Sequence, residues 1–161
     1  MTSMTDETLL KQWKKAIKYA VIKAKNMGHK VSIGGLSAGG TLSTYYAINY
    51  AQDIQGALFL FAAALELGDF FEAFITEDNI LVETSEKIWD EFQSKKRGYF
   101  VGNRPHAYGW VPAKGAERLS ELILEIEEKY PSKSQRYNDI KQPVFAVHCE
   151  FDKTANIGKI E

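Results

Sequence analysis

The sequence has little cysteine, no excess of charge and no long apolar run, and each absence excludes a class of protein. One cysteine, Cys149, among 161 residues excludes an internal disulfide framework and a multi-cysteine zinc site. The 20 Lys and Arg against 21 Asp and Glu give a net charge of −1, which argues against a nucleic-acid partner because such binding needs clustered cations. The longest apolar run, residues 57–65, is far shorter than the ~18 residues of a membrane helix.

The composition is that of an ordinary soluble globular protein, with 45% hydrophobic and 25% charged residues. A chain of this length has room for one domain, so residues 1–161 are expected to form a single domain. The opening residues do not form a secretory signal. The default expectation is a cytoplasmic protein, unless a signal precedes the present start.

Helices and buried strands are expected to alternate, which indicates an α/β fold with a parallel sheet. The apolar spacing predicts two long amphipathic helices, with a shorter helix between them in the sequence. The expected strands are short runs of apolar residues. The run within residues 55–62 is apolar on both faces, as expected for a central strand covered on both sides. The expected helices are residues 7–27, 41–50 and 116–130, and the expected strands are residues 31–34, 55–62 and 143–148.

The region from about residue 66 to 112 interrupts this alternation. It is rich in aromatic residues and contains the basic run 95–97. Short helices are expected there, for example over residues 85–95, followed by an irregular loop over residues 98–112. At least half of the aromatic residues are interpreted as core packing, and the basic run as a solvated surface.

The sequence Gly35–Leu36–Ser37–Ala38–Gly39 matches G-x-S-x-G between a predicted strand and a predicted helix. Such a turn strains the serine backbone and brings strand and helix so close that side chains at positions 35 and 39 are expected to collide. The Ser37 hydroxyl would be exposed, and the N–H of Ala38 would point at a developing oxyanion. The alternative is a glycine-rich turn that only closes the junction or cradles a phosphate. A Walker loop is excluded because no Gly-Lys-Ser/Thr follows.

With these residues the sequence resembles the α/β-hydrolase family, in particular carboxylesterases, lipases and monoacylglycerol-lipase-like members. Residues 31–46 are similar to the family's fifth strand, nucleophile elbow and following helix. Residues 55–64 are similar to the sixth strand, and residues 140–152 to the seventh strand and the turn with the acid. The resemblance implies a partial α/β-hydrolase fold, a parallel sheet with flanking helices and a cap inserted over about residues 66–112.

The resemblance also implies roles for individual residues. Ser37 corresponds to the nucleophile, Asp152 to the acid that orients the catalytic histidine, and the backbone of Ala38 to one oxyanion donor. Glu150 is the nearby competitor for the acid. The order of serine followed by acid agrees with the family. No cofactor is implied, and no metal is expected because His, Asp and Glu show no ligand spacing.

Two parts of the family's site have no counterpart. The family's histidine follows the acid, but no His follows Asp152. His29 is expected at the far end of the sheet, His148 within a strand, and His106 in the cap. The second oxyanion donor is also missing, because no strand is expected before residue 30. We therefore expect a partial chain that has little or no esterase activity alone. Two apolar strand edges would be exposed, and a missing segment or a partner chain would cover them and complete the sheet.

The leading functional interpretation is a serine-type hydrolase of small-molecule carboxylic esters with an apolar acyl or aromatic group. A thioesterase, peptidase or acyltransferase would use the same elbow, because the acyl-enzyme is common to all of them. A third alternative is a non-catalytic binding module with a hydrolase fold, whose partner chain would supply the missing strands and histidine.

Overall fold

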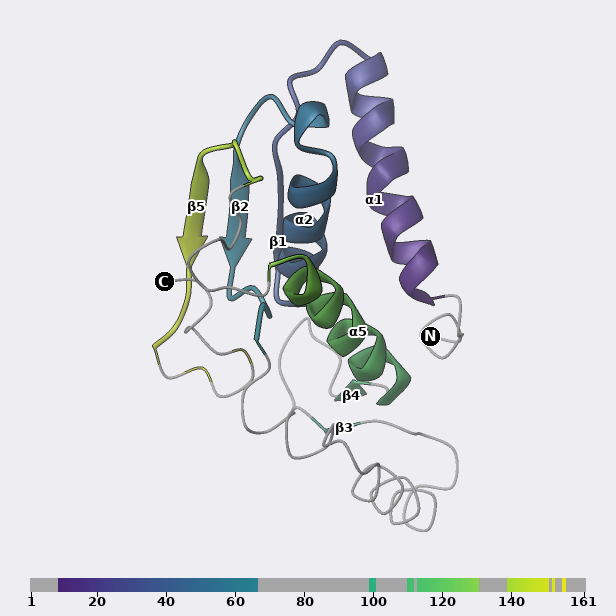
Figure 1. Ribbon diagram of the computed structural model, residues 1–161, viewed down its shortest axis with the longest axis vertical. Helices are drawn as coiled ribbons and strands as arrows, with labels where there is room; N and C mark the ends of the chain where they lie inside the picture. Colours follow the sequence, from purple (N-terminus) through teal and green to yellow (C-terminus); the bar gives the residue numbers. More distant parts are fainter. Residues whose placement is uncertain are drawn as a thin grey trace.

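The computed structural model describes residues 9–66, 99–100, 110–111, 113–130 and 139–150, together with residues 152 and 155. Its main feature is a parallel three-stranded sheet with the order β1-β2-β5. Figure 1 shows the three strands side by side with β2 in the middle. A partial α/β fold is therefore confirmed, and the strands are β1 (Ile33–Leu36), β2 (Leu58–Phe61) and β5 (Val144–Val147).

Three helices accompany this sheet (Figure 1). Helix α2 packs directly on β1 and β2, and the other two helices pack on α2 and on each other. A short 3-10 helix, η2 (Ala51–Asp53), follows α2. The long helices are α1 (Leu9–Asn26), α2 (Ala38–Asn49) and α5 (Ala113–Lys129).

The long helices and the three parallel strands occur where the sequence predicts them, but several bounds were wrong. Strands β2 and β5 are shorter than expected, so His148 lies just after β5 rather than within it. The bounds next to the glycine-rich turn were wrong as well. The first strand was expected over residues 31–34 and lies two residues later, so that it ends directly before Ser37. The next helix was expected to begin at residue 41 and begins at Ala38. Ser37 is thus the whole connection between strand and helix, because the glycines belong to these elements rather than to a loop.

The predicted burial of the sheet on both faces was also wrong. Leu58 and Leu60 are buried under α2, whereas Phe59 and Phe61 on the opposite face remain 38% and 42% exposed. The neighbouring strand β5 was expected to be buried, but all four of its residues are exposed. In the part of the chain that the structure describes, the helices gather on one side of the sheet, so the other side of β2 has no helix over it.

A side-chain network joins the helices on the covered face. The ring of Tyr46 is fully buried, and its hydroxyl donates a hydrogen bond of 3.1 Å to Asp53. The ammonium group of Lys25 donates to the same carboxylate at 2.5 Å. This ammonium group, with help from the Tyr46 hydroxyl, holds the pKa of Asp53 below its usual range, although burial opposes the shift. The network ties α1 to α2 and to η2.

The ends of two helices agree with the sequence signals. Gly28, with a φ of 80°, follows α1 as the expected left-handed residue. Helix α5 begins at Ala113 rather than at residue 116, and Leu122, Ile123 and Ile126 face the core as predicted. None of the helices within the described ranges is long and apolar enough to cross a bilayer.

Most of the predicted cap, including the expected helix over residues 85–95, lies outside the described residues. Two short segments of it are described. Strands β3 (Tyr99–Phe100) and β4 (Trp110–Val111) pair antiparallel. The expectation of a wholly irregular stretch over residues 98–112 was therefore wrong, because its two ends pair as strands.

Candidate active site

Ser37, the single residue between β1 and α2, has a strained backbone. Its φ is 52° and its ψ is −122°, a combination that L residues rarely adopt. Apart from Ala62, no other non-glycine residue in the described ranges has a positive φ. Such a conformation costs on the order of 1–3 kcal/mol and persists only where the surrounding structure imposes it.

Backbone hydrogen bonds from three directions impose this conformation. The Ser37 N–H donates to the carbonyl of Phe61 at 3.0 Å. The Ser37 carbonyl accepts from the N–H of Gly40 at 2.8 Å and from that of Ala64 at 3.3 Å. The buried hydroxyl of Thr41 donates to the carbonyl of Ala64 at 2.7 Å. The segment after β2, residues 62–65, is therefore hydrogen-bonded to Ser37 and to the start of α2, and these bonds hold Ser37 in place.

Two glycines permit the close approach of β1, α2 and this segment. A Cβ atom on Gly35 would lie 2.7 Å from the N atom of Gly40 and closer still to the carbonyl of Gly39. A Cβ atom on Gly40 would lie 2.5 Å from the Cβ of Ala63. The prediction for Gly35 is confirmed. The prediction for Gly39 was wrong, because a Cβ atom there would meet nothing within 4 Å.

The start of α2 offers a site for negative charge beside the Ser37 hydroxyl. Ala38 is the first residue of this helix, and helix geometry leaves its N–H without an intrahelical acceptor. The positive end of the helix dipole lies at the same place, and its first turn contains no acidic residue. An oxyanion next to Ser37 would therefore be stabilised here.

Asp152 lies at the same edge of the sheet as Ser37. The register aligns Leu36, Phe61 and Val147, so the residues that follow the three strands leave the sheet at one level. Neighbouring strands are ~4.8 Å apart, which puts the end of β5 about 10 Å from the end of β1. The N–H of Asp152 donates to Cys149, and its carboxylate accepts from the N–H of Ala155 at 3.2 Å.

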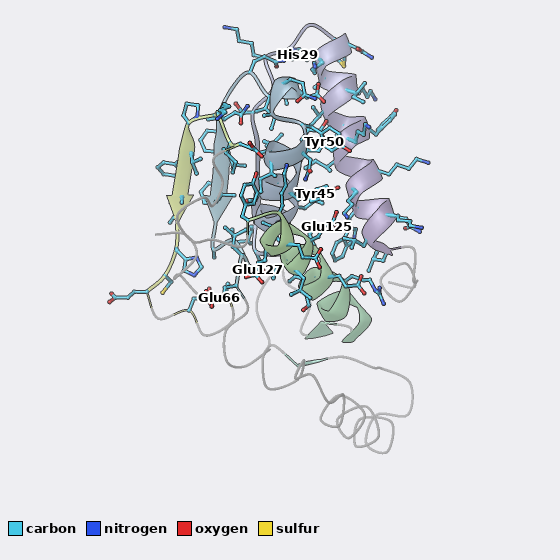
Figure 2. The ribbon with its side chains drawn as sticks, in the orientation of Figure 1. His29, Tyr45, Tyr50, Glu66, Glu125 and Glu127 are labelled. Atoms are coloured by element: carbon cyan, nitrogen blue, oxygen red, sulfur yellow. The ribbon has the colours of Figure 1, made fainter. Side chains whose placement is uncertain are left out.

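Glu150 lies near Asp152, but none of the described histidines is hydrogen-bonded to Ser37. Glu150 is exposed in the same turn as Asp152. His29 precedes β1 and lies at the opposite end of the sheet from Ser37, near the top of Figure 2. His148 directly follows β5, and its Nε2 atom is 2.8 Å from the carbonyl oxygen of Ala155. His106 lies outside the described residues. Within the described ranges, no histidine is hydrogen-bonded to Ser37.

Thr41, Ala63 and Ala64 support the site but were not singled out from the sequence, whereas Gly40 was among the glycines expected to bracket Ser37. The three consecutive alanines at 62–64 were a usable signal, because small residues after a strand permit a close backbone approach. No group of three or more His, Cys, Asp or Glu side chains that could hold a metal ion occurs in the described part of the chain.

A comparison with models of known protein families found no match for this chain, and a comparison with curated proteins found none either.

Proposed function

We propose that Ser37 is the nucleophile of a serine-type hydrolase that cleaves carboxylic esters. The observation that carries this proposal is the backbone of Ser37, strained at φ 52° and ψ −122° in a one-residue connection between a strand and a helix. A turn that only joined these elements would have no need of a side chain at this position, and glycine would adopt the conformation without strain. The resemblance to α/β-hydrolases supports the same interpretation.

The reaction would proceed in two steps. The Ser37 oxygen attacks the ester carbonyl carbon while a histidine takes the hydroxyl proton, and the N–H of Ala38 donates to the oxyanion that forms. The bond to the alcohol oxygen then breaks, and the alcohol leaves with that proton. Water, deprotonated by the same histidine, releases the carboxylic acid and restores the hydroxyl. Asp152 would orient the histidine through its carboxylate.

The base in this mechanism is neither His29 nor His148. His29 is at the opposite end of the sheet, and His148 follows β5, which β2 separates from the strand that ends directly before Ser37. The base is therefore His106 or a histidine outside the given sequence, on a further segment or on a partner chain. Replacement of His106 by Ala separates these two cases, because it abolishes acyl transfer only in the first.

The proposal is tested by trapping the acyl-enzyme. The purified chain is incubated with p-nitrophenyl butyrate and quenched in acid, and its peptides are analysed by mass spectrometry. We expect a butyryl group on Ser37, none on the Ser37→Ala variant, and an unchanged amount on Ser43→Ala. Ser43 is the matched control, because it lies in α2, which follows Ser37 directly, and its buried hydroxyl donates to the carbonyl of Gly39.

Acylation of other serines to the same extent as Ser37 would contradict the proposal. No acylation of a folded chain would exclude His106 as the base and would favour the non-catalytic alternative. Thioester, amide and ester substrates with the same acyl group then distinguish the hydrolase types, because they differ only in the leaving group.

A further inference from the structure

Helix α1 concentrates positive charge on a chain whose formal net charge is −1. Its 18 residues, LLKQWKKAIKYAVIKAKN, include six lysines and not one acidic residue. Two of these lysines face inward and are paired: Lys14 binds Glu125 of α5, and Lys25 binds Asp53. The other four lysines are exposed, but the ammonium group of Lys18 lies 4.9 Å from the centroid of the Tyr50 ring. The outer surface of the helix is therefore basic through Lys11, Lys15 and Lys23.

Two of the exposed lysines lie in a stripe along the helix. Lys11 and Lys15 are four residues apart on one face, and Ile22, seven residues after Lys15, continues the same line. Lys11 and Lys15 form no ion pair with any described residue. Figure 2 shows side chains with nitrogen tips that project from α1 on the side away from the sheet.

Apolar groups are interspersed with these charges. The side chain of Tyr19 is 67% exposed next to the stripe, and that of Ile22 is 39% exposed at its end. Another face of α1 is held in the core through Val21, Ile17 and Ala24, so this helix keeps its position on α2. The exposed face combines point charges with a tyrosine and an isoleucine along a straight helix of about 27 Å.

We propose that this stripe, defined as Lys11, Lys15 and Ile22 with the adjacent Tyr19, docks the protein on the surface of an anionic lipid bilayer. Lysines would attract the phosphates and carboxylates of the headgroups. The amphipathic ring of Tyr19 and the side chain of Ile22 would reach the boundary between headgroups and acyl chains. A nucleic acid fits less well, because α1 contains no arginine for bidentate phosphate contacts.

The docking is peripheral, because the inner face of α1 is occupied by the protein core. It is also independent of the chemistry proposed for Ser37. Each lysine near an anionic surface strengthens binding about fivefold, and the attraction falls when salt shortens the Debye length from ~10 Å at 0.1 M to ~3 Å at 1 M.

The test is co-sedimentation of the purified chain with vesicles of phosphatidylcholine, with or without phosphatidylserine. The stripe variant is Lys11→Gln with Lys15→Gln, since glutamine retains helix propensity. The matched control is Lys95→Gln with Lys96→Gln, which removes the same charge from the other basic run of the sequence. Circular dichroism and thermal unfolding of each variant verify that the fold is retained.

We expect binding to the phosphatidylserine vesicles alone, weakened about 25-fold in the stripe variant and unchanged in the control. High salt should release the wild-type chain. Absence of binding by the wild-type chain would overturn the proposal, and so would equal loss in both variants, which would indicate a response to net charge alone. Tighter, stripe-dependent binding to duplex RNA than to vesicles would also overturn it.

Discussion

Alanine substitutions at Gly35 and Gly39 should have opposite effects on stability, although both glycines belong to the same G-x-S-x-G motif. A Cβ atom at Gly35 would lie 2.7 Å from the N atom of Gly40 and nearer to the carbonyl of Gly39. These are backbone atoms, which cannot rotate away as a side chain can. A Cβ atom at Gly39 would meet nothing within 4 Å.

The magnitudes follow from these contacts. Optimal carbon contacts are ~3.5–4.0 Å, so β1 and α2 would have to separate by roughly 1 Å to admit alanine at Gly35. Overpacking of this kind costs about 3 kcal/mol, and more where the backbone cannot adjust. Alanine at Gly39 removes a glycine from the first turn of α2 and should stabilise the chain by up to about 1 kcal/mol. The two variants should therefore differ by about 4 kcal/mol.

Urea unfolding followed by circular dichroism measures both variants against the wild-type chain. We expect the midpoint to fall for Gly35→Ala and to stay or rise for Gly39→Ala. Equal midpoints for the two variants would refute the reasoning, because the turn would then not have the close approach described for Gly35.

Three further predictions concern residues around the site and the core. Thr41→Val keeps the shape but leaves the buried carbonyl of Ala64 unpaired, so unfolding experiments should show a loss of about 1–3 kcal/mol. Ser37→Gly relieves the backbone strain and should raise the urea midpoint above that of Ser37→Ala. The lowered pKa of Asp53 beside Lys25 contributes stability that is complete above the unfolded pKa of ~3.9 and is lost as pH falls through the folded value. The difference in free energy of unfolding between the wild-type chain and Asp53→Asn, measured by urea unfolding, should therefore shrink as pH falls from about 5 to about 2.

The sequence was sufficient to predict the order and type of the main elements. The apolar spacing of residues such as Val21 and Leu122 is a local property, and both are buried where expected. The bounds at the turn were wrong because glycines carry no hydrophobic signal, so the ends of β1 and α2 could not be distinguished from a loop.

Other features of the site depend on residues distant in the sequence. Gly40 rather than Gly39 is the crowded position because Ala63, from the segment after β2, lies against it. The two faces of β2 could not be distinguished because Phe59 and Phe61 are as apolar as Leu58 and Leu60. Only the arrangement of the helices on one side decides which of these side chains are covered.

Selective phosphonylation of Ser37 tests the central claim most directly. In serine hydrolases the oxyanion site and binding retain about 10³–10⁴-fold catalysis even without a complete triad. The purified chain is treated with a fluorophosphonate, and the modified peptide is identified by mass spectrometry in wild-type, Ser37→Ala and Ser43→Ala proteins. The account predicts modification at Ser37 in the wild-type and Ser43→Ala chains, with none in Ser37→Ala. A folded chain that reacts no faster at Ser37 than at its other serines would contradict it.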